Sequence, residues 1–190
     1  MLNKDIIVVF DTEYTSWEGS WQHGWNRPGE LMELVQIGAL KLDVNSGMQE
    51  LDAFEVLVRP AKNPQLSGYF TDLTGITQDM VDDDGMSFPD ALTAFSTFMG
   101  PDTGKALMFG IDDEVIELNC RLNNMAFPFD AEFFQDVEPF IREALGKERR
   151  SFCSSDLPKL LGFLGPQLAH QAIDDARCLA EALRILRFKI

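Results

Sequence analysis

The sequence predicts an α/β fold in which a mixed β-sheet of about five strands carries helices on both faces. The first observation behind this prediction is a short, β-branched apolar run at residues 6–10, which is typical of a buried strand. The second is the order of the segments, because three strand-like segments come first and helix-like and strand-like segments then alternate. The third is a long amphipathic segment that favours a final helix over residues 171–187.

Five segments are expected to be strands. Residues 5–10 have polar residues at both ends, and residues 34–42 and 54–58 alternate between apolar and polar side chains. A fourth strand is expected at residues 105–109 and a short fifth at residues 133–135.

Helices are expected between and after these strands. Ser87 and Pro89 begin one over residues 90–99, and Gly100 ends it. Further helices are expected at residues 112–122, 138–145 and 155–164. The chain contains no internal repeat, low-complexity segment or linker, so residues 1–190 are interpreted as a single domain.

The composition is that of a globular protein. With 190 residues, of which 45% are apolar, the chain can bury a core of ordinary size. The apolar run at residues 6–10 is too short for a signal peptide or a membrane-spanning helix. The 3 cysteines (Cys120, Cys153 and Cys178) are far apart, which argues against a disulfide framework or a thiolate zinc site. A cytoplasmic protein without membrane contact is therefore expected.

The charge is strongly negative and uneven. The net charge is −15, yet residues 141–190 carry 9 Lys and Arg against 6 Asp and Glu. Proteins that hold long nucleic acids through phosphate contacts are usually basic. The acidity therefore argues against an extended grip on a duplex and favours short, single-stranded ends held in a small pocket.

Two carboxylates follow the first apolar run. Asp11 and Glu13 are two residues apart, so in a strand they project from the same side. Neighbouring like charges repel unless a cation bridges them, and magnesium prefers oxygen ligands of this kind. The alternative is a pair of solvated acids in a turn after the strand.

The C-terminal helix places a third acid. Asp175 shares a helical face with Ala172 and Leu179, whereas Asp174 lies on a polar face. Asp175 is therefore expected to point into the protein. His170 converges with Asp175 more easily if it lies on a loop before the helix.

Together these residues give the chain a resemblance to the DnaQ-like 3′–5′ exonucleases of the DEDDh kind. The family's first motif, Asp-x-Glu after a hydrophobic strand, matches Asp11 and Glu13, and its third, His-x-Ala-x-x-Asp, matches His170 and Asp175. Residues 34–39 and the Leu-Thr-Gly-Ile segment at residues 73–76 are also similar to family segments. The resemblance implies an RNase H-like mixed sheet. It is strongest to the branch that trims RNA 3′ ends, which includes KapD-type bacterial proteins and the eukaryotic histone-mRNA and small-RNA exonucleases.

The second family motif is less regular here. The family usually has an acid preceded by an aromatic residue, whereas this chain has Ile111, Asp112 and Asp113. Counting from Gly110 favours Asp113 as the acid that matches, with Asp112 as the alternative. Helical register does not separate the two, because both have apolar neighbours.

The resemblance implies a metal-dependent mechanism. Two magnesium ions, for which manganese can substitute, would be held by four carboxylates, Asp11, Glu13, Asp113 and Asp175. His170 would act as the general base, and nucleoside 5′-monophosphates would leave from the 3′ ends of single-stranded RNA or DNA. The oligomeric state stays open, a homodimer included.

Substrate contacts are expected just after the first motif. Tyr14 and Thr15 follow Glu13, and all three tryptophans lie within residues 16–29, four residues apart. Three glycines and a proline there predict a loop without a stable helix. Trp21 and Trp25 could stack on bases, and ordinary packing of the loop is the alternative.

A short basic run lies near the C-terminal third of the chain. Lys147, Arg149 and Arg150 are interpreted either as phosphate contacts or as solvated charges.

A haloacid-dehalogenase-like phosphatase is one rival function. It would use Asp11 as its nucleophile but would leave His170 and Asp175 unexplained. A nucleic-acid-binding module with weak or no catalysis on the same fold is the other rival.

Overall fold

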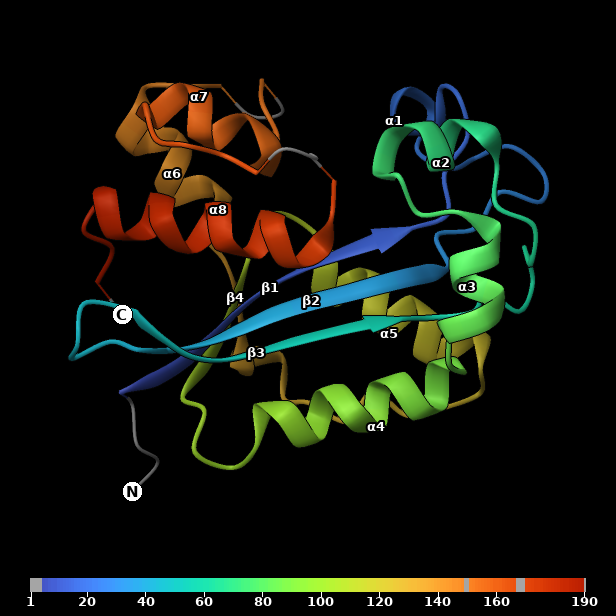
Figure 1. Cartoon of the computed structure of the whole chain (residues 1–190), viewed down its shortest axis with the longest axis horizontal. Helices are drawn as coiled ribbons and strands as arrows, with labels where there is room; N and C mark the ends of the chain where they lie inside the picture. Colours follow the sequence, from blue (N-terminus) through green and yellow to red (C-terminus); the bar gives the residue numbers. More distant parts are fainter. Residues whose placement is uncertain (1–4, 149–150, 167–169, 190) are drawn as a thin grey trace.

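The computed structural model describes residues 5–148, 151–166 and 170–189. Its strands are β1 (Ile6–Tyr14), β2 (Leu34–Asp43), β3 (Gln49–Leu57), β4 (Lys105–Met108) and β5 (Phe134–Asp136). They form one sheet in the order β3-β2-β1-β4-β5 (Figure 1). β2 is antiparallel to β1 and β3, whereas β4 is parallel to β1 and β5. The expected mixed sheet of five strands is confirmed.

The described helices follow the expected order, with additions. The α-helices are α1 (Ser20–His23), α2 (Gly68–Thr74), α3 (Gln78–Asp84), α4 (Phe88–Met99), α5 (Asp112–Leu122), α6 (Glu138–Leu145), α7 (Leu157–Leu161) and α8 (Ala172–Ile185). Two 3-10 helices are η1 (Ala131–Phe133) and η2 (Ser154–Asp156). Within the described residues, no helix has the length and apolar character needed to cross a membrane.

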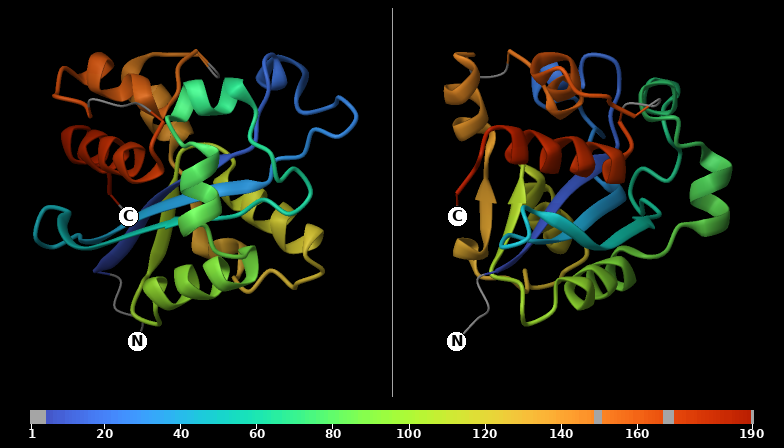
Figure 2. Two further views of the ribbon diagram at one scale, coloured as in Figure 1. Left: turned by 45° about the vertical axis from the view of Figure 1, so that its right-hand side comes forward. Right: turned by 60° about the vertical axis from the view of Figure 1, so that its left-hand side comes forward.

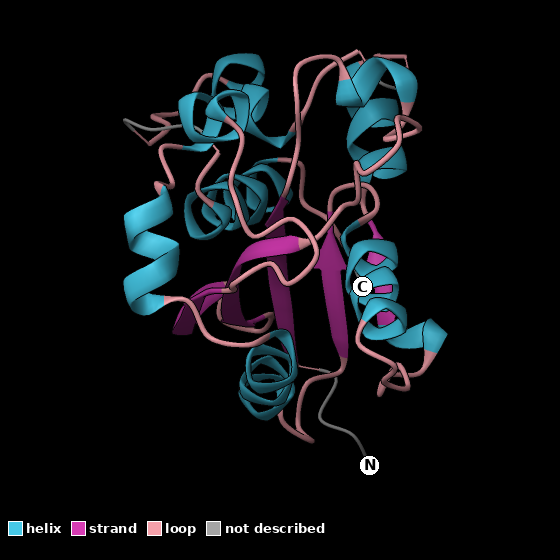
Figure 3. Ribbon diagram, turned by 90° about the vertical axis from the view of Figure 1, so that its right-hand side faces the viewer, coloured by secondary structure: helices cyan, strands magenta, loops and turns pink. Residues whose placement is uncertain are grey.

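The sheet separates two helical layers (Figures 1 and 2). α8 packs on one face, with α6 and α7 beside it, and this core includes Ile7 and Val9 of β1. α4 and α5 pack on the other face, where the core includes Val8 and Phe10. Because successive strand residues point to opposite faces, β1 contributes to both cores. The expected helices on both faces are confirmed, and Figure 3 shows them from the side.

Two strand boundaries differ from the prediction. β1 continues to Tyr14 instead of ending at residue 10, because β2 pairs with it as far as the Tyr14–Leu34 pair. β3 begins at Gln49 instead of residue 54, because it forms a hairpin with β2. Asp11 and Glu13 therefore lie within a strand and not in a turn after it.

The helices of the second half also differ at their ends. The helix expected at residues 155–164 is η2 followed by α7, and it ends at Gly162, which has a left-handed φ of 75°. The final helix spans Ala172–Ile185, shorter than the expected residues 171–187. α2 and α3 were not expected, although Ser67 and Thr77 cap them by accepting from Phe70 N and Met80 N.

Candidate active site

The end of β1 supplies the first two acids of the site. β2 borders β1 along its whole length, but β4 pairs only with residues 7–9 of β1. Beyond that point β1 has no parallel neighbour, which leaves room for other groups beside it. Asp11 is buried and Glu13 is half-buried, and both lie on the face that α8 covers.

The N-terminus of α5 fills the place beside β1 where β4 has ended. Asp112 is buried, and one of its carboxylate oxygens accepts from Thr12 N at 2.9 Å and from Thr12 Oγ1 at 2.5 Å. These bonds satisfy a backbone N–H that has no strand partner there. They also hold a third carboxylate against the strand segment that carries Asp11 and Glu13.

The prediction that Asp113, and not Asp112, belongs to the site is not supported by this geometry. Asp112 is the first residue of α5, and side chains in a helix tilt toward its N-terminus, here toward β1. The next residue is turned away by about 100°. Asp113 is half-exposed and accepts from Glu114 N, and burial, followed by the charge of Asp136, raises its pKa. The structure therefore brings Asp112, not Asp113, into the cluster.

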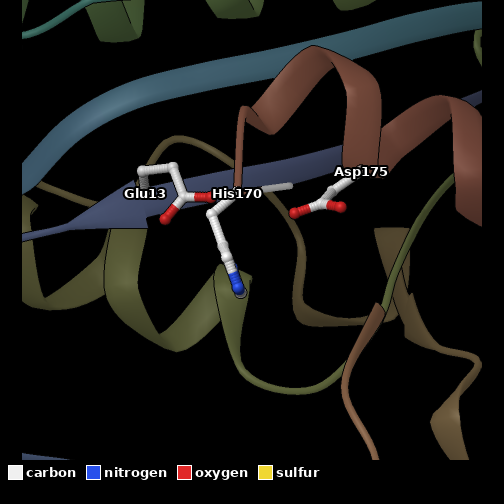
Figure 4. Close-up of side chains that lie close together, drawn as sticks. All are labelled: Glu13, His170 and Asp175. Carbon is white, nitrogen blue, oxygen red and sulfur yellow. The ribbon is translucent and has the colours of Figure 1, made fainter. Parts of the chain in front are cut away.

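α8 brings the remaining residues into place. Asp175 is 2% exposed, whereas Asp174 is partly exposed, so the expected inward direction of Asp175 is confirmed. His170 precedes α8 on a loop, as expected. One ligand atom from each of Glu13, His170 and Asp175 lies within 4.8 Å of the other two. Figure 4 shows these side chains gathered between β1 and the start of α8.

Close packing against β2 fixes the start of α8. A Cβ atom at Gly38 would lie 2.1 Å from Ile173 N, so only glycine allows this approach. Gln36 Oε1 accepts from Ala172 N at 2.9 Å, and Gln171 Nε2 donates to Thr74 O at 2.5 Å. Sequence reasoning did not select Gln36, although a glutamine inside an apolar strand is a signal that its amide has a buried partner.

The surroundings of the four carboxylates disfavour their ionised forms. Burial raises the pKa of Asp11 and Glu13 well above the usual range, and the charges of Asp112 and Asp175 raise both further. Burial is also the main cause that raises the pKa of Asp112 and of Asp175 to about 7. Because these acids repel one another when ionised, the cluster is a region of negative potential that a cation would stabilise.

The donor set fits a hard divalent cation. Asp175 Oδ1 is buried and has no hydrogen-bond partner among the described residues. Such an orphaned carboxylate oxygen is costly unless a cation or water binds it. It lies in the same cluster as Glu13 and His170, and carboxylate oxygens are the ligands that magnesium and manganese prefer.

His170 has an unusual backbone conformation and an imidazole with a lowered pKa. Its φ of 63° lies in the left-handed region, which is uncommon for residues other than glycine. Burial lowers the pKa of the imidazole, and the charge of Asp156 partly opposes that effect. A lowered pKa keeps the ring neutral near pH 7, and a neutral ring can accept a proton.

Two residues that sequence reasoning missed border the cluster. Asp156 affects the pKa of His170, and Cys153 raises that of Asp11. Asp156 Oδ2 accepts from Cys153 N at 3.1 Å, which orients both residues. η2, which contains Asp156, packs against α8, and no local sequence pattern reports that packing.

The expected substrate residues have different surroundings. Thr15 is buried, and its hydroxyl donates to Leu31 O at 2.5 Å and accepts from Glu33 N at 3.0 Å, so it closes a loop. Tyr14 packs against the core on the α5 side, while Trp25 and Trp21 extend from it. Lys147 is exposed, whereas Arg149 and Arg150 lie outside the described residues.

A mixed sheet whose central strand carries acids near its end, close to a histidine and a further acid, is an arrangement suited to a metal-dependent hydrolase. The chain belongs to the Exonuclease (RNase_T) family, whose model matches residues 8–183. The resemblance inferred from the two outer motifs is thereby confirmed.

Alignments with curated relatives cover most of the chain. Rat 3′-5′ exoribonuclease 1 is 26% identical over 193 residues, which cover 96% of this chain and 53% of the rat protein. The probable 3′-5′ exonuclease KapD of Bacillus subtilis (strain 168) is 26% identical over 176 residues, which cover 92% of this chain and 81% of KapD. The chain thus spans about half the length of the rat relative.

Solved structures support the same fold. The nuclease domain of 3′hExo, described as a DEDDh family member bound to rAMP, has a TM-score of 0.77 and 26% identity, covering 95% of this chain and 90% of that chain. A 3′-exonuclease described as recognising the histone mRNA stem-loop has a TM-score of 0.83 and 25% identity, covering 97% and 64%. The expected RNase H-like fold is confirmed.

Proposed function

We propose that this protein is a metal-dependent 3′–5′ exonuclease that acts as one domain on single-stranded nucleic acid. The observation that carries the proposal is the meeting of Glu13, His170 and Asp175 within 4.8 Å, with Asp11 and Asp112 buried beside them. A phosphatase that used Asp11 as a nucleophile would leave this convergence unexplained. A binding module would have no use for four acids that destabilise one another.

Four carboxylates would hold the metal, namely Asp11, Glu13, Asp112 and Asp175. In this proposal Asp112 has the role that was predicted for Asp113, because its carboxylate is hydrogen-bonded to Thr12 of β1. Magnesium is the cation we expect, with manganese as a substitute, because all four ligands are oxygen donors. When bound, two such ions supply Lewis-acid stabilisation to the attacking and departing oxygens of a phosphodiester.

His170 is the general base in this proposal. It accepts the proton of the attacking water, and its lowered pKa favours the neutral form that this step needs. It lies on a loop before α8 and is partly exposed, whereas Asp11, Asp112 and Asp175 are buried. Attack at the terminal phosphodiester releases nucleoside 5′-monophosphates and leaves a shortened 3′ end.

RNA 3′ ends are the first substrate to test. The rat relative is named an exoribonuclease, and a structural neighbour at 25% identity is described as recognising the 3′ end of an mRNA stem-loop. The net charge of −15 favours contact with a short terminal segment over an extended phosphate grip.

Digestion of 5′-labelled single-stranded RNA, beside its DNA equivalent, tests the proposal. We expect a magnesium-dependent ladder that shortens from the 3′ end, and no ladder with Asp175→Asn or with EDTA. Asp174→Asn is the matched control, because that neighbouring acid is partly exposed and outside the cluster. Absence of digestion by well-folded wild-type protein in magnesium and in manganese would overturn the proposal.

A further inference from the structure

The loop after β1 is held by several hydrogen bonds, although Ser16 Oγ and both ring nitrogens of His23 are buried without a hydrogen-bond partner among the described residues. It comprises residues 16–29 and is called the tryptophan loop below. Trp25 Nε1 donates to Thr15 O at 2.9 Å, and Ser20 Oγ accepts from Trp17 N at 2.8 Å. Contrary to the sequence expectation, the loop contains the single helical turn α1, between two glycines with left-handed φ of 86° and 63°.

Three aromatic rings form a ladder through this loop. The ring centroids of Tyr14 and Trp25 are 5.4 Å apart, and those of Trp25 and Trp21 are 6.3 Å apart with the rings nearly perpendicular. Trp25 is half-buried, whereas Trp21 is 58% exposed. Trp25 therefore braces the ladder, and Trp21 presents a large aromatic surface to solvent.

The ladder begins beside the carboxylate cluster. Tyr14 follows Glu13 directly in β1. Burial, with smaller contributions from the charges of Asp112, Asp11 and Glu13, raises the pKa of its hydroxyl. Figures 1 and 2 show α1 and α2 beyond the same end of β1. Ser67 Oγ, at the N-cap of α2, donates to Ser16 O at 2.5 Å, which ties the tryptophan loop to that helix.

The charges of the loop decide which kind of contact it can make. The tryptophan loop contains Glu18 and one arginine, Arg27, and Glu30 follows the loop directly. The Arg27 guanidinium donates to the backbone O of Glu18 and lies 3.9 Å from the Glu30 carboxylate. Such a surface offers no row of cations for phosphates. Stacking of a base on an aromatic ring needs no such row and tolerates any sequence.

We propose that Trp21 is a stacking surface for an unpaired base of single-stranded nucleic acid, upstream of the terminal nucleotide that enters the carboxylate cluster. This inference rests on the proposed exonuclease function and names its substrate class more closely. Trp25 and Tyr14 position Trp21 without contacting the base. A strand of several nucleotides reaches Trp21, whereas a dinucleotide occupies only the cluster.

Binding without metal separates this inference from catalysis. A labelled oligonucleotide of about twelve nucleotides is titrated in EDTA, and its anisotropy gives Kd for wild type, Trp21→Ala and Trp21→Phe. We expect Trp21→Ala to weaken binding by about 5- to 100-fold and Trp21→Phe to retain most of the affinity. Leu51→Ala is the control, because Leu51 is 51% exposed on β3 and is expected to leave Kd unchanged.

Hydrolysis of two substrate lengths completes the test. We expect Trp21→Ala to lower kcat/KM for the long oligonucleotide and to leave that for a dinucleotide unchanged. An unchanged Kd, or an equal loss on both substrates, overturns the inference, and it does so even when wild type digests RNA. Failure of wild type to cleave either substrate would instead overturn the proposed function, while the binding result stays readable.

Discussion

Two regions meet at the end of β1 and differ in the negative charge that they gather. In the carboxylate cluster, Asp11, Asp112 and Asp175 are buried and Glu13 is half-buried, and all four have raised pKa values. Asp175 Oδ1 has no hydrogen-bond partner among the described residues. In the tryptophan loop, Trp25 Nε1 and Ser20 Oγ are hydrogen-bonded, while Ser16 Oγ and both ring nitrogens of His23 are buried without a hydrogen-bond partner in the described part of the chain. The contrast is therefore one of charge, because the cluster gathers four mutually repelling acids that a cation would stabilise, whereas the loop is held by hydrogen bonds and ring contacts.

The largest effect is expected for Asp11→Asn, which breaks the cluster at its centre. We expect kcat to fall by about 10³-fold or more, because a ligand carboxylate lost from a metal site removes several kcal/mol of transition-state stabilisation. In EDTA at pH 8, the melting temperature should rise, because one of four repelling charges has gone. A variant that melts earlier in EDTA would contradict the view that these acids destabilise the metal-free fold.

The next effect concerns His170. His170→Ala should lower kcat by about 10²- to 10⁴-fold, the range for loss of a general base. The stabilisation that magnesium gives in a thermal melt should persist, because the four carboxylates remain. His23→Ala is the control, since the other histidine of the chain lies in the tryptophan loop and should not change dinucleotide hydrolysis.

A pH series distinguishes the buried acids from ordinary surface acids. The pKa of Asp175 is raised from 3.8 to about 7 in the folded protein. The stabilisation from its protonated form is thus fully present below about pH 4 and is lost as pH rises through 7. We expect the unfolding free energy of wild type in EDTA to fall relative to that of Asp175→Asn between pH 5 and 8. A difference that is constant over this range would contradict the raised pKa.

The smallest effect on stability is expected for a substitution in the tryptophan loop. Arg27→Ala removes the ion pair between the exposed guanidinium of Arg27 and the carboxylate of Glu30, which is largely shielded from solvent, with 3.9 Å between their atoms. Because the pair is long and the arginine is exposed, it should contribute about 0–1 kcal/mol, as surface pairs do, and dinucleotide hydrolysis should not change. Urea unfolding at two salt concentrations measures this, and a loss of several kcal/mol would show that the pair supports the loop.

Structural features that depend on short-range sequence patterns could be predicted from the sequence. Alternation in residues 34–42 gave β2, and helical register chose Asp175 over Asp174. Register within α5 did not separate Asp112 from Asp113, because the choice depends on where β4 ends beside β1. The roles of Gln36 and Asp156 depend on contacts between distant segments, which no local pattern reports.

The most direct measurement compares Asp112→Asn with Asp113→Asn in magnesium-dependent digestion of single-stranded RNA. Both acids lie in the first turn of α5, so the two variants lose a similar interaction with the helix dipole. If Asp112 completes the metal site, Asp112→Asn lowers kcat by about 10²-fold or more, while Asp113→Asn stays within about threefold of wild type. The reverse ranking would contradict the geometry of the site, and equal, small effects would contradict a catalytic role for either acid.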